Sequence, residues 1–358
     1  MSKKFFSVFI MKIHYKFIFG FCTLLTMGVL LYSCTTMMPT ISYANISVQE
    51  EGGVNFVKIT EDADAVAGMI TSGRPLVSVG SQLLQSNSSK MNITWWVNPR
   101  IAISPDGQRI AYINNKNKMQ NVMVKGATVG GSSTQRTFRN AVTDFSWSPD
   151  GKRLSFTEYR NNRFGIYFVN ADQGSVVQQI SSGNDNDFAP IIDKEGKFVF
   201  FHRGEGYETY SLWSFDIEKT LFSNYSRGMT PCLDPANPSV IYCGRFTSSK
   251  ESEIWKLNIE TGVEEILLSQ PGKSFTTPQI SPDRRWILCT GSSLTPAGVQ
   301  NTDIFVISTD GTLFTQLTYH PGNDISAIWA PDGKSIYFLS QRGTQDGNYN
   351  IWKMDFNL

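Results

Sequence analysis

The chain has 358 residues, enough for one large domain or two ordinary ones, and its charge is nearly balanced at 32 Lys and Arg against 31 Asp and Glu. Four of those lysines and no acidic residue lie in the first 33 positions, so the remainder carries 28 basic against 31 acidic residues, formally −3. A weakly acidic chain of this kind does not fit a polyanion, which excludes nucleic acid as the expected partner.

The first 33 residues have the parts of an export signal. Lysines come first, an apolar run over 17–31 follows, and the small residue Ser33 precedes Cys34. A charged region followed by a short apolar region and a small residue predicts a cleaved signal, not a membrane span. Met11 also begins a complete signal, so both Met1 and Met11 stay open as the true start.

The stretch Leu31-Tyr32-Ser33-Cys34 resembles the bacterial lipobox. The resemblance implies cleavage after Ser33 and a diacylglycerol on the Cys34 thiol, which anchors a chain to a membrane without spanning it. No acidic residue directly follows Cys34, so the resemblance favours an anchor on the periplasmic face of the outer membrane. The alternative is an ordinary secreted protein in which Cys34 is a chance cysteine.

The segments after the signal predict a tether and then a strand. Residues 34–55 are expected to form a flexible, lipidated tether. Residues 56–60 are expected to form a strand that belongs to the domain 56–358. Residues 61–92 are rich in Ser, Gly, Asn and Asp, and they are predicted to be a surface insertion.

A turn motif then returns at intervals of 41 to 49 residues. Its proline presets φ, its aspartate caps the turn locally, and its glycine tolerates the left-handed conformation. The copies, three intact and three degraded, are in chain order Ser104-Pro105-Asp106-Gly107, Ser148-Pro149-Asp150-Gly151, Asp193-Lys194-Glu195-Gly196, Asp234-Pro235-Ala236-Asn237, Ser281-Pro282-Asp283-Arg284 and Ala330-Pro331-Asp332-Gly333. A period of about 40–50 residues built from short strands is typical of propeller blades.

One repeat contains the strands of one blade. In the second repeat, alternating apolar residues and turn signals predict strands at 144–147, 153–157, 165–169 and 176–180. Four antiparallel strands make a propeller blade, so six repeats predict an all-β, six-bladed propeller of four-stranded antiparallel blades.

The sixth repeat ends after its third strand and would leave an open sheet edge, which propellers avoid. The segment 56–60 is similar to the fourth strand of the fifth repeat, at 314–318. We therefore predict that this N-terminal strand pairs with residues 350–355 and closes the ring.

The sequences Phe145-Ser146-Trp147-Ser148-Pro149-Asp150-Gly151-Lys152 and Ile328-Trp329-Ala330-Pro331-Asp332-Gly333-Lys334 resemble the WD-like repeat of the TolB-type propeller family. The resemblance covers roughly residues 95–358. In TolB proteins an α/β domain precedes a six-bladed propeller that binds a peptidoglycan-associated lipoprotein. No such domain fits between Cys34 and Phe56, so the resemblance implies a lipoprotein of the wider family. It implies the fold and leaves the function open, because one fold hosts many activities.

The cysteines fit lipidation better than a disulfide framework. Cys22 leaves with the signal, and Cys34 is expected to carry the lipid. Cys232, Cys243 and Cys289 lie in apolar strands and are expected to be buried thiols. A bridge between Cys232 and Cys243, which lie on neighbouring strands of one hairpin, stays open as an alternative.

No catalytic constellation stands out in the sequence. The Gly-x-Ser-x-Gly elbow of a serine hydrolase does not occur. After the signal only His202 and His320 remain, and they are expected to be separate polar residues on loops. No catalytic residue, metal or cofactor is therefore expected.

A candidate binding site lies where the innermost strands begin, at one mouth of the central channel. Aligned there, the repeats supply two aromatic and two acidic residues, and the ligand-binding candidates are Trp96, Asp187, Phe275 and Asp324. Such a set could bind a peptide or a basic, partly apolar ligand. The alternative is that the aromatic rings plug the channel while the aspartates cap turns.

These features predict a monomeric, non-catalytic envelope lipoprotein that binds a protein or peptide at the channel mouth. Its contact with the membrane would be the lipid on Cys34. Two alternatives stay open. One is an enzyme acting on polysaccharide, a lyase or glycosidase, and the other is a glycan-binding lipoprotein that uses Trp95 and Trp96.

Overall fold

The computed structural model describes residues 54–61, 101–114, 120–138, 142–160, 163–172, 177–181, 185–205, 209–248, 251–294, 300–344 and 349–358. The predicted export signal, the lipidation site Cys34, nearly all of the tether and all but the first residue of the insertion lie outside these residues. Within them all regular structure is β-strand. No helix in this part of the chain has the length and apolar character needed to cross a bilayer.

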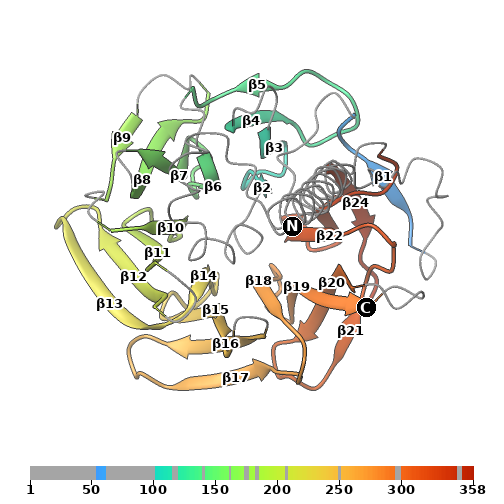
Figure 1. Ribbon diagram of the computed structural model, residues 1–358. Helices are drawn as coiled ribbons and strands as arrows, with labels where there is room; N and C mark the ends of the chain where they lie inside the picture. The colour runs from blue at the N-terminus through green and yellow to red at the C-terminus, as the bar shows by residue number, and fades with distance from the viewer. Residues whose placement is uncertain are drawn as a thin grey trace, which may run out of the picture. The chain divides into compact units, whose positions relative to one another are not determined.

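The described strands form six four-stranded antiparallel sheets, and Figure 1 shows these sheets arranged as blades around a central axis. From the centre outward, blade 1 contains β2 (Ile101–Ile103), β3 (Arg109–Asn114), β4 (Asn121–Gly126) and β5 (Thr134–Gln135). Blade 2 contains β6 (Val142–Trp147), β7 (Arg153–Arg160), β8 (Arg163–Asn170) and β9 (Val177–Gln179). Blade 3 contains β10 (Asp187–Ile192), β11 (Phe198–Arg203), β12 (Ser211–Asp216) and β13 (Leu221–Arg227).

The other three blades follow the same plan. Blade 4 contains β14 (Met229–Leu233), β15 (Val240–Phe246), β16 (Ser252–Asn258) and β17 (Glu264–Leu268). Blade 5 contains β18 (Phe275–Ile280), β19 (Trp286–Leu294), β20 (Gln300–Ser308) and β21 (Phe314–Gln316). Blade 6 contains β22 (Asp324–Trp329), β23 (Ser335–Ser340), β24 (Asn350–Asp355) and, as its outermost strand, β1 (Phe56–Lys58). The predicted six-bladed propeller is confirmed.

Closure of the ring by the N-terminal strand is also confirmed. Strand β1 pairs antiparallel with residues 352–354 of β24. The pairing continues beyond β1, because the backbone N–H of Ile59 donates to the carbonyl oxygen of Ile351 at 2.8 Å. The buried Lys125 of blade 1 donates from its Nζ to the carbonyl oxygen of Ile59, also at 2.8 Å. The closing segment therefore also ties the last blade to the first.

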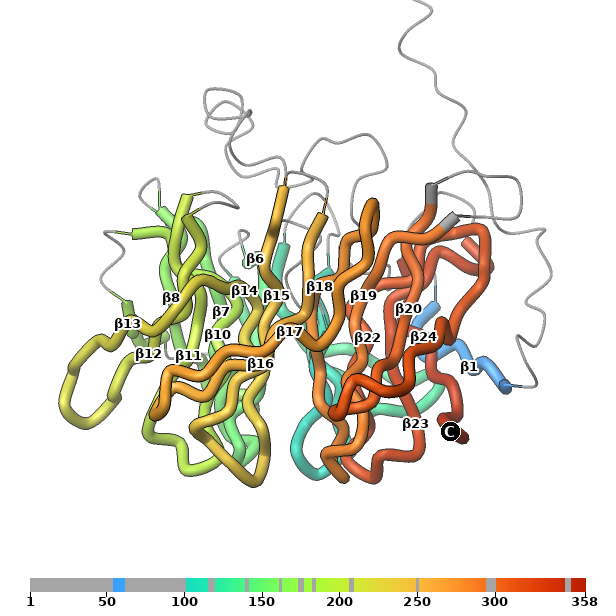
Figure 2. Tube along the Cα trace, turned by 90° about the horizontal axis from the view of Figure 1, so that it is seen from below, coloured from blue at the N-terminus to red at the C-terminus, as the bar shows by residue number. Residues whose placement is uncertain are grey.

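The recurring turns join each innermost strand to the second strand of its blade. In the second copy, Ser148 Oγ donates to Asp150 Oδ1 at 2.5 Å and accepts the N–H of Arg153 at 2.9 Å. Gly151 closes the turn with a φ of 67°, a conformation that glycine adopts without strain. Because all six turns follow the innermost strands, they lie at one end of the ring (Figure 2). We call this the turn end, and the opposite end, where the innermost strands begin, the start end.

A bulge interrupts the innermost strands halfway between these two ends. In blades 3 to 6 the pairing register shifts there, and the bulged residues Ala189, Thr230, Thr277 and Ser326 have φ values of 50°, 48°, 51° and 54°. The freed N–H of Ala189 donates to Asp144 Oδ1 of the preceding blade at 2.8 Å. That of Thr230 donates to His202 Nδ1 at 3.1 Å. The bulges thus redirect backbone donors from their own sheet to the neighbouring blade.

The three cysteines of the propeller are free and buried. Cys232 lies opposite Tyr242 in the pairing of β14 with β15. Successive side chains on a strand point to opposite faces, so the next residue, Cys243, points away from Cys232. The alternative of a bridge between them is therefore not realised, and the expectation of buried thiols is confirmed.

Candidate functional site

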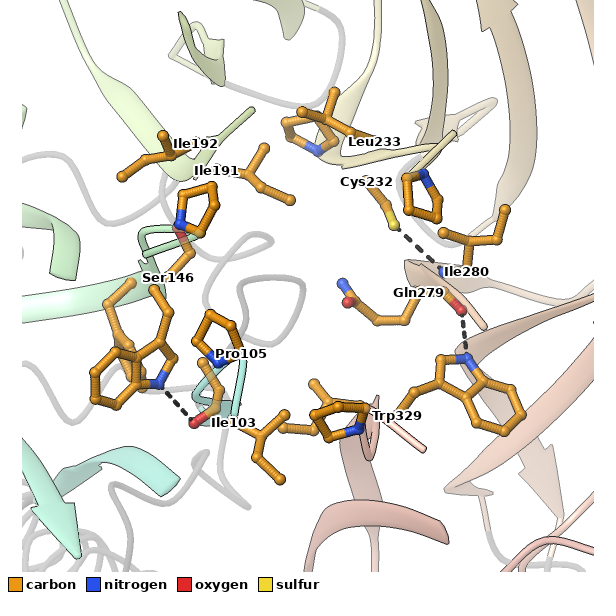
Figure 3. Close-up of a pocket in the computed structure, with 18 of the residues that line it drawn as sticks. Ile103, Pro105, Ser146, Ile191, Ile192, Cys232, Leu233, Gln279, Ile280 and Trp329 are labelled. Atoms are coloured by element: carbon orange, nitrogen blue, oxygen red, sulfur yellow. Dashed lines mark hydrogen bonds between the residues drawn. The ribbon is translucent and has the colours of Figure 1, made fainter. Parts of the chain in front are cut away.

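A cavity of about 470 Å³ opens on the channel axis at the turn end. Figure 3 shows its wall, which is built from the last residues of all six innermost strands and from the turns that follow them. We call the residues of this wall the turn mouth. They are Ile101, Ala102, Ile103, Pro105, Phe145, Ser146, Trp147, Pro149, Ala189, Pro190, Ile191, Ile192, Pro231, Cys232, Leu233, Pro235, Gln279, Ile280, Pro282, Ile328, Trp329 and Pro331.

Prolines make the wall of the turn mouth stiff and poor in hydrogen-bond donors. Five come from the recurring turns and two from innermost strands, and they are Pro105, Pro149, Pro235, Pro282, Pro331, Pro190 and Pro231. Each has a φ held by its ring and no backbone N–H. A surface of this kind loses little conformational freedom when a ligand binds.

The polar atoms of the turn mouth are mostly used to join the blades. Trp147 Nε1 donates to the carbonyl oxygen of Ala102 at 3.1 Å, which joins blade 2 to blade 1. Trp329 Nε1 donates to the carbonyl oxygen of Gln279 at 2.9 Å, which joins blade 6 to blade 5. Cys232 Sγ accepts the N–H of Ile280 at 3.3 Å. The side chain of Gln279, in contrast, points into the cavity (Figure 3).

None of the described residues that line the turn mouth is Asp, Glu, His, Lys or Arg. Burial raises the pKa of the Cys232 thiol to about 12, so this group stays protonated at neutral pH. A protonated, buried thiol is a poor nucleophile. Among the described residues, the wall therefore presents no charged side chain and no activated thiol.

The rim outside the turn mouth is polar. Asp106 and Asp150 lie on it, and hydrogen bonds from Ser104 and Ser148 respectively lower the pKa of each carboxyl, so both stay ionised at neutral pH. An apolar centre inside a charged rim is the usual anatomy of a protein-binding surface.

At the start end the structure places the predicted Asp187 in a buried ion pair. Its Oδ1 accepts from Arg203 Nε at 2.6 Å, and its side chain is only 1% exposed. Burial raises the pKa of Asp187, and Arg203 opposes that shift. The guanidinium of Arg203 also stacks on Trp213, 4.5 Å from the ring centroid, and reaches Asp185 at 3.1 Å.

The predicted Asp324 also has a buried arginine partner in its own blade. Arg342 Nη2 donates to Asp324 Oδ2 at 2.8 Å, and neither side chain has any exposed surface. Burial raises the pKa of Asp324 against the lowering effect of Arg342. On its other side the Arg342 guanidinium lies 4.1 Å from the ring centroid of Phe56 in the closing strand. This pair therefore connects the innermost and outermost strands of blade 6.

Phe275, the predicted aromatic of the start end, belongs to the core of blade 5. It is fully buried and meets Phe305 and Phe314 edge to face, with ring centroids 5.6 Å apart in both cases. Trp96 lies outside the described residues. The structure thus gives three of the four candidates buried structural partners and does not join them into an open site, so direct ligand contact by them stays a prediction.

The expectation that both histidines lie on loops is wrong for His202. This residue lies within β11, is fully buried, and packs against Phe188 and Tyr210. Burial lowers its pKa to about 3, which keeps the imidazole neutral. Among the described residues, no three His, Cys, Asp or Glu side chains come together in a way that could hold a metal ion.

A comparison with protein-family models matches residues 208–358 to the TolB beta propeller domain. A curated relative, the Tol-Pal system protein TolB of Helicobacter pylori strain J99, is 27% identical over 179 residues. The alignment covers 49% of this chain and 40% of the relative, so this chain spans less than half the length of the curated relative that it matches. The resemblance of the repeats to the TolB-type propeller is confirmed.

Solved structures agree on the fold. TolB from Acinetobacter baumannii superimposes with a TM-score of 0.56 at 16% identity, over 70% of this chain and 64% of that one. An oligogalacturonate lyase from Vibrio parahaemolyticus superimposes with a TM-score of 0.50 at 11% identity, over 73% of this chain and 89% of that one. At these identities the likeness shows the propeller fold alone, and function has to be argued from the site.

Proposed function

We propose that this TolB-type propeller is a non-catalytic binding module of the cell envelope, which holds a protein or peptide at the turn mouth. The observation that supports this most is the turn mouth itself. It is a cavity of about 470 Å³ with apolar walls and stiff prolines, and its lining in the described part of the chain contains no Asp, Glu, His, Lys or Arg. The same observation argues against a glycosidase or lyase acting at this cavity, because those reactions need positioned acids or bases.

The size of the cavity suits the insertion of a few side chains from a partner. One large aromatic side chain that buries about 150 Å² of apolar surface gains roughly 4 kcal/mol before the costs of association are counted. Because the wall is already formed, those costs fall mainly on the ligand. A partner would therefore need only a short segment at the turn mouth, with further contacts at the charged rim.

The envelope location is part of the proposal and is supported by sequence similarity. The curated relative is named as a Tol-Pal system protein. The lipid anchor on Cys34 is proposed from the lipobox-like sequence before it. We propose that the mature protein is a monomer held in this way on the periplasmic face of the outer membrane. Cys34→Ala is expected to move the protein from the membrane fraction to the soluble fraction and to remove labelling by a palmitate analogue.

The binding function can be tested by affinity capture from solubilised envelopes of the source bacterium. The baits are the tagged full chain, Ile191→Asp and Leu221→Asp. Ile191 is half-buried in the turn mouth, whereas Leu221 is 60% exposed on the outermost strand β13. The two variants place the same charge in and away from the proposed site.

The proposal expects a partner that the parent and Leu221→Asp recover equally and that Ile191→Asp loses, with unchanged thermal melting of all three baits. Equal recovery by all three would place the interaction elsewhere and contradict the proposal. Ile280→Asp, which places a charge in blade 5 of the turn mouth, is the second variant. It should lose the same partner, which would show that the loss in Ile191→Asp is not a local effect of that substitution.

A further inference from the structure

Gln279 differs from the residues at its equivalent position in every other blade. The position two residues before each recurring turn lines the turn mouth in all six blades, and it is occupied by Ala102, Ser146, Ile191, Cys232, Gln279 and Ile328. Only Gln279 carries a carboxamide, which offers two N–H donors and one acceptor oxygen. The others are apolar or carry a single weak or small polar group.

The backbone of Gln279 is fixed, whereas its side chain is available. Its carbonyl oxygen accepts from Trp329 Nε1 at 2.9 Å, and its Cα lies opposite Leu288 in the pairing of β18 with β19. The half-buried side chain points into the cavity (Figure 3) and makes no hydrogen bond to any described residue. A fixed backbone beneath a free amide is an arrangement prepared for a ligand.

The other polar side chains at the wall already have partners. Ser146 Oγ lies 2.8 Å from Ser155 Oγ, and the indole N–H groups of Trp147 and Trp329 donate to backbone carbonyls. The prolines contribute no N–H. Gln279 is therefore the one polar side chain of the described wall whose donors and acceptor all lack a partner in the described residues.

A carboxamide matches the main chain of an extended peptide. An extended residue presents its N–H and C=O on the same edge, and one amide side chain can accept from the first while it donates to the second. A charged group in the same place would be desolvated without an opposite charge among the lining residues, which is costly. The turn mouth therefore favours uncharged segments with apolar side chains and an accessible backbone edge.

We propose that Gln279 is the specificity-determining residue of the turn mouth and that it pairs with the main-chain amide of an extended, uncharged peptide segment. This inference rests on the proposed function and narrows it from a protein or peptide to one class of peptide segment. The apolar wall holds the side chains of the segment, and Gln279 selects its backbone conformation.

The test begins with a random heptapeptide library displayed on phage and selected on the full chain. Phage that also bind Ile191→Asp are discarded, so that only peptides bound at the turn mouth are kept. The inference expects the selected sequences to be depleted in Asp, Glu, Lys and Arg. The strongest peptide is then synthesised with each backbone nitrogen methylated in turn, which removes one N–H donor at a time.

Binding is measured by calorimetry on the parent, on Gln279→Met, which keeps the side-chain length, and on Gln279→Leu. One methylated position is expected to weaken binding to the parent about tenfold. The same methylation is expected to have little effect on Gln279→Met, whose own affinity is already about tenfold lower. Such non-additivity is the signature of a direct contact.

The outcomes separate the two proposals. Peptides that bind at the turn mouth but tolerate every methylation, or bind Gln279→Met as tightly as the parent, overturn this inference and leave the proposed function standing. Enrichment of charged sequences overturns it as well. If no peptide is enriched over Ile191→Asp, the proposed function fails, and this inference fails with it.

Discussion

The two ends of the central channel are built from the same six innermost strands, and yet they differ in chemistry. At the turn end, apolar residues of the strands and prolines of the strands and following turns surround an open cavity. At the start end blades 3 and 6 begin with Asp187 and Asp324, each buried against an arginine of its own blade. Charged residues are therefore buried in ion pairs at one end, while an uncharged surface lines the candidate cavity at the other. The burial and the partners of these residues distinguish the two ends.

The largest expected effect comes from breaking the buried pair at the start end. In Arg342→Met the Asp324 carboxylate loses its only ion-pair partner among the described residues, and Phe56 of the closing strand loses the guanidinium that lies on its ring. Removing one member of a buried pair costs about 3–5 kcal/mol. Urea unfolding of the parent and of Arg342→Met measures this loss.

Arg203→Met is the matched control, because the Arg203 side chain is 14% exposed whereas that of Arg342 has no exposed surface. Arg203→Met should lower the free energy of unfolding by less than Arg342→Met does. Peptide binding at the turn mouth should be unchanged in the folded fraction of both variants. A cost below about 1 kcal/mol for Arg342→Met would show that the pair does not hold the start end together.

The next effect is a dependence of stability on pH that arises from His202, also near the start end. Its pKa is lowered to about 3 in the folded chain from an ordinary value of 6.5, because the ring is buried. As the pH falls, His202 takes up a proton in the unfolded chain before it does so in the folded chain. The free energy of unfolding therefore falls as the pH drops below about 6.5. Over pH 6.5 to 5 the fall is about 2 kcal/mol at most.

The variant His202→Gln retains an acceptor for the N–H of Thr230 and has no ring to protonate. Its unfolding free energy should change less over this pH range than that of the parent, as measured by urea titration at each pH. Parallel pH profiles for the two proteins would contradict the assignment to His202.

A smaller effect is expected from the bond between blades at the turn mouth. Trp329→Phe keeps the ring in the wall and removes the hydrogen bond to the carbonyl oxygen of Gln279. A loss of about 1 kcal/mol in unfolding free energy is expected. Since this bond fixes the backbone beneath Gln279, peptide affinity should fall too. Trp255→Phe in blade 4 removes an indole hydrogen bond to Glu253 and does not touch the turn mouth, so it should leave the affinity unchanged.

An effect of similar size is expected at the bulges that lie between the two ends. Ala189 has a φ of 50°, so Ala189→Gly relieves strain that offsets the usual cost of a glycine in a strand. Ala327 in β22 is also buried, but its φ is not positive, so it serves as the unstrained comparison. Ala189→Gly should therefore be about 1 kcal/mol less destabilising than Ala327→Gly in thermal unfolding, and equal costs would contradict strain at the bulge.

The blades and the closing strand could be predicted from the sequence because their signals are local. Each Ser-Pro-Asp-Gly turn marks a hairpin by its own chemistry, and the segment 56–60 matches the missing strand in length and alternation. The burial of Asp187 could not be predicted in the same way. Its partner Arg203 is 16 residues away and meets it only through the register of β10 with β11.

The turn mouth was missed for a different reason. Five of its seven prolines belong to the motif that identifies the turns, so the sequence pattern indicates turns and gives no sign that these prolines line a cavity. A signal was present in the sequence. Aligning the repeats two residues before each turn gives six residues with no Asp, Glu, Lys or Arg, and Gln279 is the one amide among them.

Photo-crosslinking in intact envelopes tests the turn mouth as the binding surface most directly, with benzoyl-phenylalanine placed at position 191 in the turn mouth or at position 221 on β13. We predict one polypeptide that is crosslinked from position 191 and not from position 221, and that is lost when Ile280→Asp is added. Crosslinks from position 221 alone, or equal crosslinks from both positions, would contradict the claim that the turn mouth is the binding surface.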